Sequence, residues 1–193
     1  MRSLRLRLTP LILLGTAASA ALAGCSGDIT LGPAVFENRT DTLQLWAATG
    51  TAVYLPSAYI ISTKSGARLD QISYFDFLYD ITPTGEHILL PLAAIASTGT
   101  TLGNPGLLPT TTPYDSILVA QQTGYVTTDT LPIRVGDVFY VRSRPSSGCF
   151  LGIPYYAKLQ VISIKDEDRS LFIQILSNIN CGYRSLQPGL PGK

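Results

Sequence analysis

His87 is the single histidine of the chain, so any Ser-His-Asp or Cys-His catalytic device would have to use it. No Gly-x-Ser-x-Gly motif accompanies it. Catalytic zinc sites take three protein ligands, usually including histidine, and one histidine makes such a site unfavourable. Because His87 lies at the start of a strand-like segment, 86–90, we expect a structural or surface role and no enzymatic activity.

Carboxylates are the next candidates for chemistry. Asp76 and Asp80 share one face of a predicted strand, which places their Cα atoms about 13 Å apart. Glycoside hydrolysis needs two carboxyl groups about 5 to 9.5 Å apart, so we expect this pair to be solvated or paired with basic residues. An enzyme acting on glycans would need Asp76, Asp80 or Glu86 to meet Asp115 in one cleft. The acidic run 166–168 lacks the spacing of a calcium loop and is expected at an exposed hairpin tip.

Basic and aromatic residues alternate on two neighbouring predicted strands. Side chains of alternate residues project from the same face of a strand. If the two strands pair, they form one possible binding patch, which consists of Tyr140, Arg142, Arg144, Tyr156 and Lys158. Arginine offers forked donors and tyrosine a flat apolar face, a combination suited to anionic glycans, lipid headgroups or an acidic protein surface. The alternative is that these residues only cover a half-exposed sheet.

The first 24 residues have the order of a secretory signal peptide. Three arginines precede an uncharged stretch of about 17 residues that is too short and too diluted by Pro, Gly, Thr and Ser for a membrane-spanning helix. The stretch ends in Leu22-Ala23-Gly24-Cys25, which resembles the lipobox of bacterial lipoproteins. The resemblance implies that Cys25 is acylated and becomes the mature N-terminus.

This resemblance also implies an address. Several acyl chains on Cys25 would anchor the protein stably to a membrane. Ser26, which is not Asp, implies the outer membrane of a Gram-negative bacterium. We therefore expect a signal peptide at 1–24, a lipidated N-terminus and tether at 25–33, and a single β domain at 34–193. Loss of the signal leaves 11 basic and 13 acidic residues, a formal charge of −2.

Two cysteines remain, Cys149 and Cys181, in a compartment expected to be oxidising. We predict that they form a disulfide. The alternative, a metal pair, lacks a nearby histidine, since His87 is far away in sequence.

Composition narrows the function classes. The chain has 193 residues, 46% hydrophobic and 14% charged, and this is ordinary for one globular domain rather than for a disordered chain. A formal charge of +1 does not favour a nucleic-acid partner. Motifs of nucleotide-binding loops are absent from the sequence, and we predict no cofactor.

Short apolar runs separated by Gly, Pro, Asn, Asp and Thr are typical of an all-β protein. We predict an antiparallel sandwich or barrel-like domain. Its last three strands, 137–144, 155–165 and 170–177, should form a C-terminal β-meander. The other predicted strands are 34–38, 42–48, 51–55, 58–63, 67–69, 73–81, 86–90, 115–120 and 131–134.

Two segments carry further predictions. In 73–81, Phe75, Phe77, Tyr79 and Ile81 share one face, which should be core. Segment 97–113, rich in Gly, Thr and Pro, is predicted to be a long loop, either functional or mobile.

The C-terminal strands carry a second resemblance. Residues 136–143 and 156–164, with a strand that ends in Arg and Tyr-Ala-Lys opening the next, resemble the HmuY-like lipoproteins, an all-β family that captures haem. Haem-binding members supply paired histidines or methionines, whereas this chain has one histidine and no methionine after Met1.

Together these patterns predict a lipid-anchored envelope domain that binds or scaffolds an unidentified ligand or envelope protein. Two alternatives remain open: a haem or small-ligand carrier, and an envelope enzyme acting on glycans.

Overall fold

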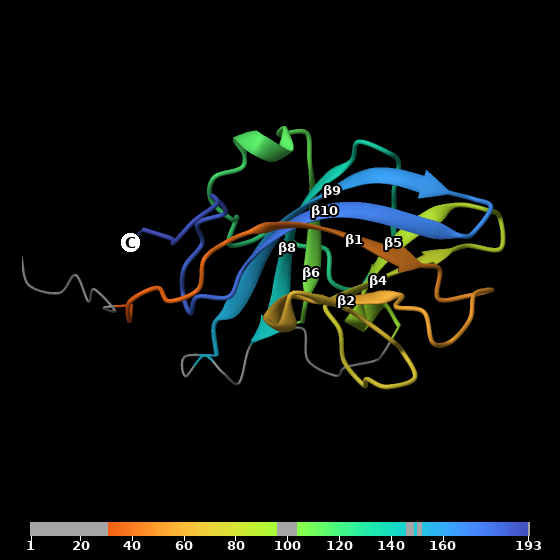
Figure 1. Ribbon diagram of the computed structural model, residues 1–193, viewed down its shortest axis with the longest axis horizontal. Coiled ribbons are helices and arrows are strands. Elements are labelled where there is room, and N and C mark those ends of the chain that lie inside the picture. Colours follow the sequence, from red (N-terminus) through yellow and green to blue (C-terminus); the bar gives the residue numbers. More distant parts are fainter. Residues whose placement is uncertain (1–30, 96–103, 146–148, 150–151, 193) are drawn as a thin grey trace, which may run out of the picture. The chain divides into compact units, whose positions relative to one another are not determined.

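Two antiparallel β sheets form the computed structural model, which describes residues 31–95, 104–145, 149 and 152–192 (Figure 1). The first sheet has the strand order β1-β10-β9-β8-β6 and the second has the order β3-β2-β4-β5-β7. The sheets stay open at their edges, so the fold is a sandwich and not a barrel. The all-β prediction is confirmed.

The strands are short in the second sheet and longer in the first. Their bounds are β1 Thr40–Trp46, β2 Ala58–Ile60, β3 Ser65–Ala67, β4 Phe77–Ile81, β5 His87–Pro91, β6 Gly106–Thr110, β7 Leu131–Pro132, β8 Val138–Pro145, β9 Pro154–Lys165 and β10 Ser170–Asn178. Three short 3-10 helices complete the elements: η1 Ile61–Thr63, η2 Leu92–Ala94 and η3 Tyr114–Ser116. Within the described ranges there is no helix that is long and apolar enough to cross a membrane.

The predicted C-terminal meander is confirmed. β8, β9 and β10 are successive antiparallel neighbours, and β1 adds to the outer side of β10. The β9–β10 hairpin turns at residues 166–169, whose acidic side chains are exposed as predicted.

The central core lies between the two sheets. Its completely buried side chains include Leu45 of β1, Tyr59 of β2, Phe77 and Tyr79 of β4, and Ile173 of β10. Because alternate residues of both sheets point inward, the strands interlock in one apolar layer. The predicted core face of 73–81 is thus confirmed at Phe77 and Tyr79.

The other face of this segment is also partly buried. Leu78 is buried in a second cluster with Ala58, Ile60 and Phe75 on the outer side of the short sheet. Phe75 joins that cluster because β4 begins only at Phe77. Residues of the connection between β3 and β4, among them Leu69, Ile72 and Tyr74, pack against this outer side.

Several strand predictions were wrong. Segments 34–38 and 51–55 form bends and turns apart from a bridge at Asn38, and 115–120 begins as the helix η3. Segment 97–113 is not one loop, because residues 106–110 form β6 and pair with β8. Gly106 and Pro109 obscure this strand in the sequence, since both are uncommon within strands. Residues 96–103 lie outside the described part of the chain.

The disulfide between Cys149 and Cys181 is confirmed, with the two Cα atoms 5.5 Å apart. Cys149 is buried, and Cys181 directly follows the segment in which the side chains of Asn178 and Asn180 bond to each other. The bond therefore ties the β8–β9 connection to the C-terminal end of β10.

Candidate functional site

Strands β8 and β9 pair as predicted, so Tyr140 lies opposite Lys158 and Arg142 lies opposite Tyr156. However, Tyr140, Tyr156 and Lys158 are buried. Tyr140 and Tyr156 belong to a third apolar cluster that also contains Tyr114, Ile117, Ala120 and, near the C-terminus, Leu186. Any role of the predicted patch in binding therefore depends on its two arginines.

Lys158 acts as an internal clamp in this cluster. Its ammonium group donates hydrogen bonds to the backbone oxygens of Tyr114 and Ile117, at 3.0 and 2.9 Å. It also lies 4.6 Å from the centroid of the Tyr114 ring, a cation–π distance. Burial lowers the pKa of Lys158. The side chain thus holds η3 against the sheet.

The two arginines of the patch point to different neighbours. The Arg142 guanidinium lies 4.8 Å from the centroid of the Tyr125 ring and donates to the backbone oxygen of Asn104. An irregularity in the β8–β9 register between Arg142 and Pro145 changes the course of the strand at Arg144. Arg144 instead stacks on the Tyr74 ring, 3.6 Å from its centroid. The five residues therefore do not form a continuous surface.

Asp76 is buried and not solvated, and it lies beside Arg144, so of the two expected environments it has the one with a basic neighbour. Its carboxylate accepts hydrogen bonds from the backbone amides of Ile61, at 2.7 Å, and of Arg144, at 3.3 Å. Burial raises the pKa of Asp76 to about 6, although both amides and the Arg144 charge oppose the shift. A cavity of about 70 Å³ opens here, lined also by Ser62, Ser143 and Tyr155. This volume suits a few water molecules rather than an organic ligand.

Asp80 is paired, but with Thr49 and not with the basic residue that was one of the two expectations. It accepts hydrogen bonds from the amide of Thr49 at 2.9 Å and from the Thr49 hydroxyl at 2.8 Å. Asp80 therefore fixes the loop that follows β1.

His87 joins the two sheets at their hairpin end. Its Nδ1 lies 2.8 Å from the hydroxyl of buried Tyr79, and its Nε2 lies 3.0 Å from Oδ1 of Asp166 in the β9–β10 turn. The Tyr79 and His87 rings are stacked. Neither described pocket is lined by His87. The contacts are those of a structural residue.

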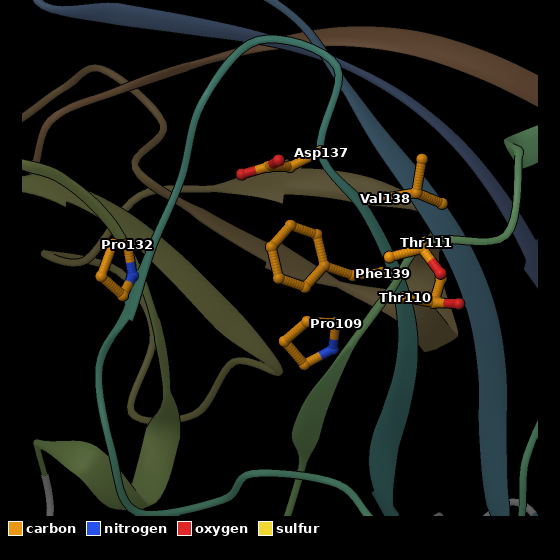
Figure 2. A pocket seen from close by; sticks show the side chains of 7 residues that line it. All are labelled: Pro109, Thr110, Thr111, Pro132, Asp137, Val138 and Phe139. Atoms are coloured by element: carbon orange, nitrogen blue, oxygen red, sulfur yellow. The ribbon is translucent and has the colours of Figure 1, made fainter.

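The larger pocket, of about 520 Å³, lies at one open edge of the sandwich (Figure 2). It is bounded by the edge strand of each sheet, β6 and β7, and by the start of β8. In Figure 2 the Phe139 ring lies at the centre of the view, with Pro109 below it, Pro132 to its left and Asp137 above it. The lining residues are Pro109, Thr110, Thr111, Pro132, Asp137, Val138 and Phe139.

Local interactions hold the lining residues of this pocket in position. Phe139 is almost fully buried because it belongs to the central core, so it forms the floor. The Asp137 carboxylate accepts a hydrogen bond from the amide of Arg134, at 2.8 Å, and this bond closes the turn between β7 and β8. The Thr110 hydroxyl accepts from the amide of Thr112, at 3.1 Å. These bonds hold the polar rim in place.

The chemistry of this lining is limited. Asp137 is the one ionisable residue among the seven, and neither His, Cys nor Met is present to ligate a haem iron. The smaller cavity also holds one carboxylate, that of Asp76. The clustering of Asp76, Asp80 or Glu86 with Asp115 that a glycan-cleaving enzyme would need is therefore not found in these two pockets. In the part of the chain that the structure describes, no three His, Cys, Asp or Glu side chains are grouped to hold a metal.

Sequence reasoning missed this pocket because four of its lining residues come from segments predicted as loop or strand end. A usable signal was the apolar pair Leu107-Leu108 inside the Gly, Pro and Thr-rich run. Comparison with known proteins adds no assignment, because no family model, curated protein or solved structure matches the chain.

Proposed function

We propose that this protein is a lipid-anchored, non-enzymatic binding module of the bacterial cell envelope. The address rests on the sequence: the Arg-led apolar stretch ends in Leu22-Ala23-Gly24-Cys25, and Ser26 follows. The module is the β sandwich that begins a few residues later. The observation that carries its binding role is the pocket of about 520 Å³ at the open edge, which is within the size range of small-molecule sites.

The lining favours an uncharged ligand with both apolar and hydroxyl-bearing faces, and we propose a neutral glycan. Pro109 and Pro132 are exposed and present apolar ring carbons, which can pack against the C–H face of a sugar ring. Thr110, Thr111 and Asp137 supply hydroxyl and carboxylate groups that can bond to sugar hydroxyls. No Lys or Arg lines the pocket, and the Asp137 carboxylate would repel an acidic sugar.

The test is a glycan array probed with the mature lipoprotein in detergent. We expect neutral oligosaccharides to bind in preference to sialylated or uronate-containing ones. Thr111→Trp places a large ring at the rim and should weaken binding by at least about tenfold, a loss of about 1.4 kcal/mol. Thr128→Trp is the matched control, because Thr128 is also exposed but lies outside the lining.

Three outcomes would contradict the proposal. Preference for acidic glycans would show that the ligand class is wrong. Binding that survives Thr111→Trp would place the ligand elsewhere. An unmodified Cys25 peptide, recovered from the membrane fraction and identified by mass spectrometry, would show that the proposed lipid anchor is wrong.

A further inference from the structure

Exposed apolar side chains gather at the end of the sandwich where the chain enters from Cys25. Three segments are joined there by backbone and side-chain hydrogen bonds: 35–38, 118–120 and 184–189. Asn38 forms two backbone bonds with Gly189, both 2.9 Å, and its side chain donates to two oxygens of the same tail. Leu118 accepts a bond from the Leu186 amide at 2.8 Å.

This end, which we call the anchor-side end, exposes five large apolar residues: Val35, Phe36, Leu118, Val119 and Leu190. Val35 is 69% exposed, although its amide and that of Phe36 are fixed by the side-chain oxygen of Asn180. The exposure therefore belongs to an ordered part of the structure. Figure 1 shows the entering segment and the C-terminal tail at the same end, away from the β9–β10 hairpin.

The charges at this end are compatible with a membrane. Residues 31–39, 115–120 and 180–192 contain four charged side chains, those of Glu37, Arg39, Asp115 and Arg184. Two of these are positive and two are negative, so the end has no net charge that anionic lipids would repel. The apolar residues are therefore surrounded by few groups that would resist entry into the headgroup region.

The short segment between Cys25 and Gly32 makes the bilayer the surface nearest to this end. The chain is attached to the sandwich from Gly32 onward, because Tyr183 donates a hydrogen bond to the Gly32 oxygen at 2.9 Å. Seven residues from Cys25 to Gly32 span at most about 25 Å even when fully extended. If Cys25 is embedded as a lipid anchor, the anchor-side end must stay within that distance of the bilayer, whereas β1 leads away from it.

We infer that the anchor-side end docks on the bilayer surface, with Val35, Phe36 and Leu190 in the headgroup region. This inference rests on the proposed lipid anchor. It gives the domain a fixed orientation, in which the loop 49–55 and the β9–β10 hairpin face away from the membrane. A flexible tether alone would not impose that orientation.

The experiment compares two tryptophan positions in the full-length, lipidated protein. Trp46, the only tryptophan, is first replaced by Phe. Val35→Trp reports on the anchor-side end, and Val53→Trp, in the loop after β1, is the matched control because Val53 is similarly exposed at 65%. Both variants are reconstituted into vesicles of phosphatidylethanolamine with a minority of phosphatidylglycerol, containing phosphatidylcholine with a nitroxide on its acyl chain.

We expect the nitroxide to quench the Val35→Trp variant at least about twofold more than Val53→Trp, because interfacial apolar side chains reach about 5–10 Å into the headgroup and acyl boundary. If both variants float with the vesicles and are quenched equally, the docking is wrong but the lipid anchor is supported. The exposed apolar residues would then be candidates for contact with a protein. Protein that fails to float would overturn the anchor and the docking together.

Discussion

Asp76 should make the stability of this protein depend on pH. Its side chain is 3% exposed, and burial raises its pKa to about 6 from an ordinary value of 3.8. Between these two values the folded protein holds a proton that the unfolded chain has released. The free energy of unfolding must therefore fall as pH rises through this window, and it should level off above about pH 6.

The size of the effect follows from the same shift. A difference of about two pH units between the folded and unfolded pKa corresponds to about 3 kcal/mol. This is a considerable part of the free energy of unfolding of a typical domain, which is about 5 to 15 kcal/mol. Asp76→Asn removes the titration while keeping an oxygen for the Ile61 amide.

The assay is urea unfolding followed by far-UV circular dichroism, at a series of pH values from about 3.5 to about 7.5. Because other groups also titrate, the quantity of interest is the difference in the free energy of unfolding between wild type and Asp76→Asn. As pH rises, the wild type should lose stability relative to Asp76→Asn. The control, Asp129→Asn, changes an exposed aspartate and should run parallel to wild type. A difference that is independent of pH, or that grows in favour of wild type, would refute the reasoning.

Three further predictions concern the framework. Replacing Cys149 and Cys181 with Ala should lower the free energy of unfolding by about 3 to 4 kcal/mol, because the bond closes a loop with a sequence separation of 32; urea unfolding of the double variant checks this, and an unchanged midpoint would contradict it. Lys158→Met should cost about 1 to 3 kcal/mol, since two backbone oxygens lose their donor inside an apolar cluster, and a variant as stable as wild type in thermal unfolding would show that water replaces the ammonium. Gly106→Ala should by itself lower the free energy of unfolding by about 1 to 3 kcal/mol, because its Cβ would lie 2.9 Å from the backbone oxygen of Val126. Calorimetry that finds an unchanged melting temperature would contradict this close approach.

The elements that sequence reasoning located best are those where alternation and pairing agree. β8, β9 and β10 are long, rich in β-branched and aromatic residues and joined in order, so local pattern was sufficient. β6 was missed because its position depends on pairing with β8, a neighbour about 30 residues away, and not on its own composition.

The candidate site could be predicted only in part. Alternation correctly brought Tyr140 and Lys158 together on paired strands, but it could not show that Tyr114 and Ile117 would cover them. Burial on the outer side of a sheet is decided by where loops return, and no local pattern records that. The same limitation hid the burial of Asp76.

The two prolines beside the pocket have a consequence for contacts between copies of this protein. Pro109 and Pro132 lie on the edge strands of the two sheets, where the backbone of a neighbouring molecule could otherwise extend either sheet. Proline has no N–H to donate, so each edge lacks a donor at that position. If the protein is anchored as proposed, its copies are confined to two dimensions and meet often, so the missing donors on both edges would help the copies to resist edge-to-edge aggregation.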